Sequence, residues 1–221
     1  MTDSNRISCV LFDLDGTLLD TAPDFIRVLH TMRAVKQLPP LNEQDIRNTV
    51  SGGARQMVKL AFGGQPGETE FDRNLVDFLA NYNDLLESSK SESCLFEGIQ
   101  TVIEQLESNQ RKWGIVTNKP EKYSLPLMEQ LSLNPPVLVC PEHVKEAKPS
   151  PEALFLACSK LNANPENSIY IGDHERDIIA GRAASMKTVV AGWGYFSETN
   201  PTQAWQADFY AENPLDLLEY C

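Results

Sequence analysis

Two aspartates, Asp13 and Asp15, follow an apolar run and come directly before Gly16 and Thr17. The run over residues 8–12 is typical of a buried strand. Because side chains alternate across a strand, both carboxylates start on the same side, where they repel each other and favour a hard divalent cation. Gly16 allows the backbone to turn its N–H groups towards an anion. The pattern indicates a site for a metal and an anion, although a plain turn would also explain Asp15 and Gly16.

Two further groups suited to phosphate stand where predicted elements end or begin. Thr117 and Asn118 end an apolar run with a hydroxyl and an amide, which can donate hydrogen bonds to phosphate oxygens. Taken alone, this pair is more typical of a helix cap. Lys148 comes just before a helix that Pro151 is placed to start, and a surface lysine is the usual interpretation of such a residue.

A second acidic pair follows another apolar run, at Gly172 and Asp173, with Asp177 four residues further on. One helical turn can bring Asp173 and Asp177 towards the same point. Acidic residues in the first turn of a helix are also favourable for helix electrostatics alone. Each of these groups has an ordinary structural explanation, and their coincidence at successive strand ends is what indicates a functional site.

The elements that position these residues alternate between strands and helices. Strands are expected at residues 8–12, 113–116, 137–140, 168–171 and 188–191, and helices at 99–106, 124–131, 151–161 and 176–184. This alternation predicts an α/β fold, a Rossmann-like parallel sheet covered by helices on both faces. Ligands of such sheets bind beyond the carboxyl ends of the strands, which is where the polar residues above are expected to lie.

Residues 22–90 interrupt the alternation and are predicted to be helical. Pro23 suits a first helical position, Asn42 could cap the next helix, and residues 71–86 form a long later one. We therefore predict a catalytic core of residues 1–18 and 93–221 and an inserted helical cap of residues 19–92, with hinges near 18–22 and 88–94.

The predicted cap contains a glycine-rich segment, Ser51-Gly52-Gly53-Ala54-Arg55. Its exposed N–H groups and guanidinium would suit a substrate carboxylate or phosphate. A glycine-rich junction between helices with a surface arginine explains the same residues equally well. Thr21 and Asp24, beside the hinge, could also face the cleft.

The charge of the chain restricts its partners. Nineteen basic and 31 acidic side chains give a formal net charge of −12, which repels nucleic acid and anionic lipid and is also common in proteins that are simply soluble. Five scattered cysteines, without a C-x-x-C pair, fit reduced thiols, and Cys9, Cys140 and Cys158 are predicted to fill the core. No secretory signal or membrane-spanning run is visible, so a cytoplasmic protein is expected. The sequence does not indicate an oligomeric state.

In order, the motifs DxDGT, T-N, K-P and GDxxxD resemble those of the haloacid dehalogenase superfamily, and the helical insert lies where that family has its C1 cap. The resemblance implies that Asp13 is a nucleophile that forms an aspartyl-phosphate. It implies that Asp15 is first the general acid and then the general base. Dehalogenases of the family lack the second aspartate, so Asp15 favours phosphoryl transfer.

The same resemblance implies the remaining roles. Mg²⁺ would be held by Asp13, the backbone carbonyl of Asp15 and Asp173. Asp177 would support the metal through bound water, while Gly16, Thr17 and Gly172 support the site. The transferring phosphoryl group would be bound by Thr117, Asn118 and Lys148. The substrate is expected to be a small phosphorylated metabolite.

Within the family, the chain is most similar to the phosphoglycolate phosphatase-like group. Three segments, at residues 51–55, 113–120 and 140–145, resemble bacterial N-acetylmuramic acid 6-phosphate phosphatases of cell-wall recycling. That ester is the leading substrate hypothesis, with phosphoglycolate as the alternative. A phosphomutase similar to β-phosphoglucomutase, a receiver domain that only accepts phosphate, and a catalytically silent scaffold are further alternatives.

Overall fold

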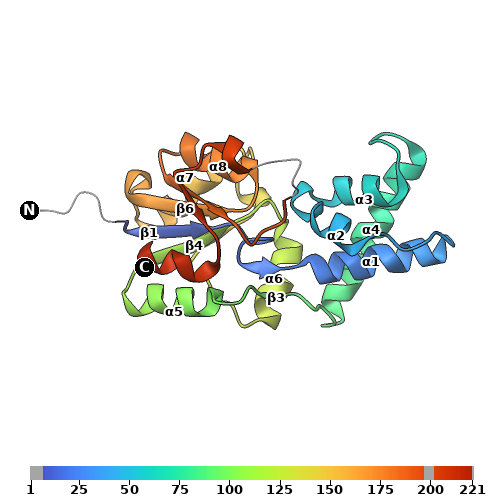
Figure 1. Ribbon diagram of the computed structural model, residues 1–221, viewed down its shortest axis with the longest axis horizontal. Helices are drawn as coiled ribbons and strands as arrows, with labels where there is room; N and C mark the ends of the chain where they lie inside the picture. The colour runs from blue at the N-terminus through green and yellow to red at the C-terminus, as the bar shows by residue number, and fades with distance from the viewer. Residues whose placement is uncertain (1–6, 197–201, 221) are drawn as a thin grey trace, which may run out of the picture.

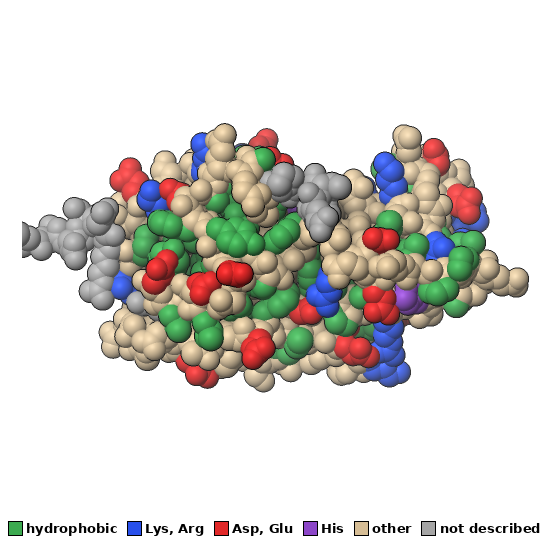
Figure 2. Space-filling view, in the orientation of Figure 1, with side chains coloured by type: hydrophobic (Ala, Val, Ile, Leu, Met, Phe, Trp, Pro, Cys, Tyr) green, Lys and Arg blue, Asp and Glu red, His purple; other side chains and the backbone are tan. Residues whose placement is uncertain are grey.

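The computed structural model describes residues 7–196 and 202–220. Figure 1 shows two lobes side by side, a core that contains the sheet and a cap that is entirely helical. Acidic side chains are spread over both lobes on the face shown in Figure 2, in keeping with the net charge of −12. Among the described helices, none combines the length and the apolar composition needed to span a bilayer.

The core is built on a parallel sheet. Within the described residues it has six strands, in the order β5 (Leu138–Val139), β4 (Lys112–Val116), β1 (Cys9–Phe12), β6 (Ser168–Gly172), β7 (Lys187–Ala191) and β8 (Phe209–Ala211). Phe12 pairs with Ile115 on one side and with Ile171 on the other. This register brings the residues that follow β1, β4 and β6 to one edge of the sheet.

Helices cover both faces of this sheet, as the near-continuous apolar strands predict. Val10 and Phe12 of β1 belong to a buried cluster that includes residues of α5 (Ile99–Ser108) and α6 (Glu121–Gln130). Cys9 and Leu11 point to the opposite face and pack with α7 (Glu152–Leu161) and α8 (Glu175–Ala183). The α/β prediction is confirmed, and the buried positions of the three predicted core cysteines are confirmed as well.

The cap consists of α1 (Ala22–Val35), α2 (Glu43–Arg47), the short 3₁₀ helix η1 (Val50–Gly52), α3 (Ala54–Phe62) and α4 (Thr69–Glu87). Asn42 caps α2 as predicted, because its side chain accepts hydrogen bonds from the N–H groups of Gln44 and Asp45. Phe25 of α1 packs against Phe78 and Tyr82 of α4, with ring centroids 6.0 Å apart for Phe25 and Phe78 and 4.7 Å apart for Phe25 and Tyr82.

The two connections between the lobes are paired with each other. The outgoing connection contains β2 (Leu19–Asp20) and the returning one contains β3 (Cys94–Leu95), and these form a short antiparallel ladder. This ladder lies beside the two predicted domain boundaries.

Asp24, at the start of α1, holds the returning connection in place. Its buried carboxylate accepts hydrogen bonds from Ser91 Oγ at 2.5 Å, Glu92 N at 2.7 Å and Ser93 Oγ at 2.6 Å. The suggestion that Asp24 faces the cleft is therefore wrong, because its carboxylate is fully used by the connection.

Other elements differ from the sequence prediction in extent. The strand β8 and the β2–β3 ladder were not expected, since two- and three-residue strands carry little periodic signal. Helix α6 begins at Glu121, three residues earlier than predicted, with Pro126 inside it. The remaining short helices are η2 (Pro141–His143), η3 (Pro165–Asn167), η4 (Thr202–Trp205) and η5 (Pro214–Tyr220).

The role of Asp24 can be tested by removing its carboxylate. We expect Asp24→Ala to lower the free energy of unfolding by about 2–4 kcal/mol, because three donors, among them the buried Ser93, lose a buried charged acceptor. Asp84→Ala, at an exposed position of α4, is the matched control and should change stability by no more than about 0.5 kcal/mol. Urea denaturation measures both, and equal stability of the two variants would contradict the role given to Asp24.

Candidate active site

Lys148 is the centre of a buried polar cluster at the carboxyl edge of the sheet. Its Nζ lies 2.9 Å from Asp13 Oδ1 and 2.7 Å from Asp177 Oδ1, and its side chain is 1% exposed. It also contacts Tyr170 Oη at 2.6 Å and the carbonyl oxygen of Val116 at 3.0 Å. The interpretation of Lys148 as an ordinary surface lysine is therefore wrong. Its ammonium compensates two carboxylates that come from different elements.

Asp173 completes a group of three carboxylates. One oxygen from each of Asp13, Asp173 and Asp177 lies within 4.8 Å of the others. Asp173 Oδ2 accepts hydrogen bonds from Ser51 Oγ at 2.7 Å and from the Tyr195 N–H at 2.8 Å. Asp173 Oδ1 is buried and has no hydrogen-bond partner among the described residues.

The electrostatics of this group favour a cation. Burial, together with the charges of Asp13 and Asp177, raises the pKa of Asp173 to about 8. Burial also raises the pKa of Asp13 to about 6, despite the adjacent Lys148. Three close oxygen donors, one of them without a partner, fit a hard divalent cation such as Mg²⁺. Asp13 and Asp173 would hold it directly, while the side chain of Asp15 lies outside this group.

Two glycines allow the carboxylates to approach so closely. Gly16 has a φ of +77°, and a Cβ there would lie 2.1 Å from Asp173 Oδ2. A Cβ on Gly172 would lie 2.4 Å from the Cβ of Asp177. Thr17 is fully buried beside them, and its carbonyl oxygen accepts a hydrogen bond from Trp193 Nε1. Gly16 and Gly172 are thus required by close packing, and their role in supporting catalysis stays a prediction.

At the N-terminus of α8, the residues that cap the helix also belong to the site. Asp177 Oδ2 accepts a hydrogen bond from the N–H of His174, and His174 Nδ1 accepts one from the N–H of Arg176. Burial and the charge of Arg176 lower the pKa of His174 to about 4, so its ring is neutral and can act as an acceptor. Asp177 therefore serves helix capping through one oxygen and the ion pair with Lys148 through the other.

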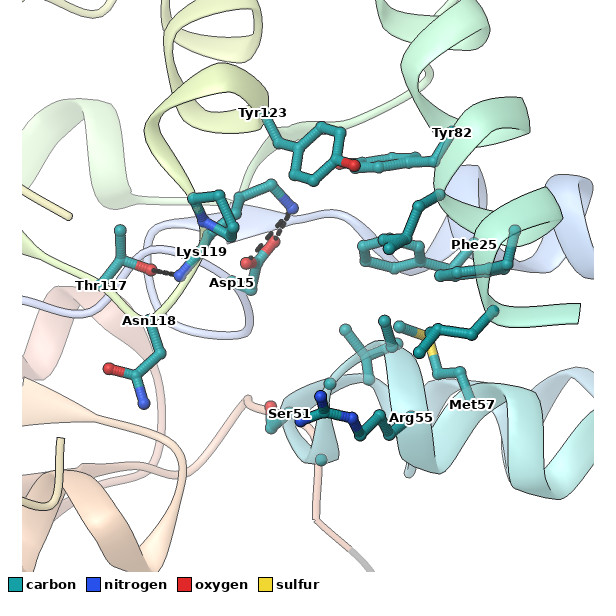
Figure 3. Close-up of a pocket in the computed structure, with 18 of the residues that line it drawn as sticks. Asp15, Phe25, Ser51, Arg55, Met57, Tyr82, Thr117, Asn118, Lys119 and Tyr123 are labelled. Carbon is teal, nitrogen blue, oxygen red and sulfur yellow. Dashed lines mark hydrogen bonds and ion pairs between the residues drawn. The ribbon is translucent and has the colours of Figure 1, made fainter. Parts of the chain in front are cut away.

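Asp15 pairs with a residue that the sequence did not single out, Lys119. Lys119 Nζ lies 3.0 Å from Asp15 Oδ1 and 4.9 Å from the ring centroids of Phe25 and Tyr82 in the cap (Figure 3). Burial alone would lower the pKa of Lys119, but the charge of Asp15 raises it above its ordinary value. Thr21 Oγ1 also donates to Asp15 Oδ1, at 2.6 Å. The position of Lys119, directly after Thr117 and Asn118, was the signal that could have revealed it.

Thr117 and Asn118 lie at the same edge, after β4. Asn118 Nδ2 donates to the carbonyl of Lys148 at 2.9 Å, and Asn118 Oδ1 accepts from the N–H of Lys148 at 3.1 Å. Its amide thus fixes the backbone that carries Lys148. Thr117 Oγ1 accepts a hydrogen bond from the Lys119 N–H. Phosphate binding by these two residues stays a prediction.

A cavity of about 510 Å³ lies between the two lobes above Asp13 and Asp15. Its core side carries Thr117, Asn118 and Lys119, and further basic groups are supplied by Lys122, Arg176 and the cap residue Arg55. The cap adds an apolar wall of Phe25, Val50, Met57, Leu75, Phe78, Leu79 and Tyr82. The predicted cap residues Ser51, Gly52, Gly53 and Arg55 all line the cavity, and Figure 3 shows Ser51 and Arg55 on its cap side.

Comparison with known proteins agrees with this arrangement. The family model described as haloacid dehalogenase-like hydrolase matches residues 10–191. An N-acetylmuramic acid 6-phosphate phosphatase of Pseudomonas aeruginosa is 44% identical over 97% of this chain and 94% of its own length. A phosphoglycolate phosphatase of Xanthomonas campestris is 37% identical over 95% of this chain and 94% of its own.

The fold is also found in solved structures. The crystal structure of a putative phosphoglycolate phosphatase from Lactobacillus delbrueckii superposes with a TM-score of 0.83. The match covers 97% of this chain and 98% of that one, at 24% sequence identity. This likeness supports the fold of both the core and the cap.

The raised pKa values generate a prediction for the metal-free protein. Carboxyls with an ordinary pKa near 3.8 that titrate near 6 and 8 in the fold bind more protons in the native than in the unfolded state. Stability is therefore lost as the pH rises from about 4 through 8. We expect the melting temperature with chelator to fall by about 5–10 °C between pH 5 and pH 8, and saturating Mg²⁺ to reduce this fall.

Asp173→Asn is the control for this measurement, because it removes the carboxyl with the higher pKa. Its melting temperature should fall less over the same pH range. An equal fall in the variant and the wild type would show that other groups cause the pH dependence.

Proposed function

Because the chain belongs to the haloacid dehalogenase-like hydrolases and is a phosphoric monoester hydrolase, we propose that it hydrolyses N-acetylmuramic acid 6-phosphate through an aspartyl-phosphate on Asp13. The observation that carries the choice of ester is the large cavity with an apolar wall on one side and basic groups on another. The geometry around Asp13 and Asp15 supports the proposed chemistry.

Asp13 is placed to act as the nucleophile. Its Oδ1 accepts the Leu14 N–H at 2.7 Å and pairs with Lys148, so we assign the attack to Oδ2 of this cavity-lining side chain. In the first step Oδ2 forms a bond to phosphorus while the bond from phosphorus to the sugar oxygen breaks. A carboxylate nucleophile divides one difficult displacement into two easier ones.

Asp15 transfers the proton in both steps. Its carboxyl gives a proton to the departing sugar oxygen, and the resulting carboxylate then takes a proton from the water that attacks phosphorus. This second attack breaks the bond between phosphorus and Asp13 Oδ2 and releases inorganic phosphate. Lys119 lies 3.0 Å from the Asp15 carboxylate and compensates its charge between the two steps.

The remaining residues of the floor bind the transferring phosphoryl group. The hydroxyl of Thr117 lines the cavity and would donate to its oxygens, the buried ammonium of Lys148 supplies positive charge beside Asp13, and Asn118 holds Lys148 in position. Mg²⁺, held by Asp13, Asp173 and the backbone carbonyl of Asp15 with Asp177 acting through water, would supply further compensation of phosphoryl charge. The reaction thus depends on positioning and charge compensation.

The cavity supports the larger of the two candidate esters. Its volume of about 510 Å³ falls in the range of about 300–1,000 Å³ found for sites that enclose drug-sized molecules. A phosphorylated N-acetyl sugar with a lactyl ether presents methyl groups to the apolar wall and a carboxylate to Arg55. Phosphoglycolate has two carbons and would leave most of the wall in contact with water.

The alternative functions predict different products. A phosphomutase would return phosphate to a sugar without net release, and a receiver domain would keep covalent phosphate without turnover. The well-formed cavity between core and cap favours hydrolysis of a small molecule over the role of a receiver domain. We place the reaction in the cytoplasm, where sugar phosphates of this class are retained.

The proposed substrate is tested by comparing the two esters with purified enzyme. We expect kcat/KM for N-acetylmuramic acid 6-phosphate to exceed that for phosphoglycolate by at least about tenfold, since only the sugar fills the apolar wall. Equal or faster turnover of phosphoglycolate would contradict the choice of ester without affecting the chemistry.

Arg55 is tested in the same assay with a counterpart that lacks the carboxylate, N-acetylglucosamine 6-phosphate. Arg55→Ala should raise KM about fivefold or more for N-acetylmuramic acid 6-phosphate and much less for N-acetylglucosamine 6-phosphate, because only the former offers a carboxylate. Arg73→Ala, at an exposed position of α4 outside the cavity, is the control. An unchanged ratio of the two KM values would make Arg55 a structural residue.

The catalytic roles are tested by two isosteric substitutions. Asp13→Asn should lower kcat by at least about 10³-fold and Asp15→Asn by about 10²–10⁴-fold, because each removes a chemical step while the melting temperature stays similar or rises. Chelation should abolish activity and Mg²⁺ should restore it. Near-normal turnover of Asp13→Asn would refute the assignment of the nucleophile.

A further inference from the structure

A residue of the cap reaches into the carboxylate group of the core. Ser51, in η1, donates a hydrogen bond from Oγ to Asp173 Oδ2 at 2.7 Å, although the two residues are 122 positions apart. Ser51 is 9% exposed and Asp173 is fully buried. Figure 3 shows Ser51 at the end of the cap helix segment that faces the core. This contact joins the cap directly to a proposed metal ligand.

Ser51 donates to Oδ2, the oxygen of Asp173 that also has close neighbours in the core. The Tyr195 N–H donates to the same Oδ2 at 2.8 Å, and Gly16 approaches it so closely that a Cβ there would lie 2.1 Å away. Asp173 Oδ1, in contrast, is buried without a partner among the described residues. Ser51 therefore orients the carboxylate while the other oxygen stays available to a cation.

Tyr195 connects the same carboxylate to the hinge. Its hydroxyl donates to Asp20 Oδ1 at 2.6 Å and accepts the N–H of Thr21 at 2.7 Å. Asp20, in turn, is held by both terminal nitrogens of Arg47 in the cap, each at 2.9 Å. A movement of the cap that displaced Ser51 would thus act on Asp173 through one direct contact and would also strain the hinge.

We propose that Ser51 is a positioning residue through which closure of the cap and binding of Mg²⁺ strengthen each other. The hydroxyl fixes the Asp173 carboxylate for the metal only when the cap is closed. By thermodynamic linkage, the metal must then favour the closed cap by the same factor. The inference rests on the proposed function only in that it takes Mg²⁺ as the cation.

The first test measures Mg²⁺ binding by calorimetry in the absence of any phosphate ester. Ser51→Ala should raise the Kd for Mg²⁺ about tenfold, as is typical when a group that orients a metal ligand is removed. Thr49→Val is the matched control, since it removes a hydroxyl from the same segment that bonds only within the cap, to the carbonyl of Asp45. Its Kd should stay within about twofold of the wild type. Ser51→Thr keeps the hydroxyl and should recover most of the affinity.

The second test follows the cap itself by hydrogen–deuterium exchange of peptides that cover residues 48–57. Added Mg²⁺ should slow exchange there in the wild type and in Thr49→Val, and should have little effect in Ser51→Ala. Melting temperatures of all variants without metal show that each is folded.

Four results would overturn the proposal: an unchanged Kd in Ser51→Ala, an equal loss in Thr49→Val, no recovery in Ser51→Thr, or tighter binding in Ser51→Ala. The last would mean that the cap hydroxyl competes with the metal for Asp173. A wild type that binds no Mg²⁺ at all would instead remove the metal from the proposed function, so the two failures are distinguishable.

Discussion

The convergence of three buried carboxylates at one edge of the sheet is the constraint on which the other features depend. Burying three carboxylates whose oxygens lie within 4.8 Å of one another costs folding free energy unless their charges are compensated. Lys148 compensates Asp13 and Asp177 through direct ion pairs, while Asp173 receives only hydrogen bonds. Gly16 makes the close approach sterically possible. The residual negative charge is the reason why the site favours a cation and, with it, a phosphate ester in a protein of net charge −12.

The connections between the lobes hold the cap residues that line the cavity in one orientation relative to this edge of the sheet. Two unpaired connections would leave the cap free to rotate, whereas the β2–β3 ladder and the buried Asp24 restrict its motion at the hinge. Tyr195 extends this restriction into the site, since its backbone binds Asp173 and its hydroxyl binds Asp20. The geometry of the hinge and that of the carboxylates are therefore not independent.

The sequence predicted the fold class and the residues of the carboxylate group because both depend on local patterns. Apolar runs that end in polar residues give parallel strands, and the carboxyl ends of parallel strands meet at one edge. Asp13 and Asp173 could be brought together on that basis, whereas Lys148 precedes a helix and was assigned to the site through the family motif. Asp24 was misplaced, because helical periodicity does not distinguish a side that faces a cavity from one that faces a returning connection. Lys119 was missed because its partners lie in segments far from it in sequence.

Because of Lys119, substitutions in the cap also affect the charges of the core. Its ammonium contacts Asp15 in the core and the rings of Phe25 and Tyr82 in the cap, so one buried charge depends on both lobes. Replacing these rings by smaller side chains would enlarge the cavity and would also admit water to the ion pair beside Asp15, which weakens it. A cap altered to accept a different ester must therefore keep a dry, electron-rich surface above Lys119. The apolar wall of the cavity is for this reason partly fixed by the ion pair between Lys119 and Asp15.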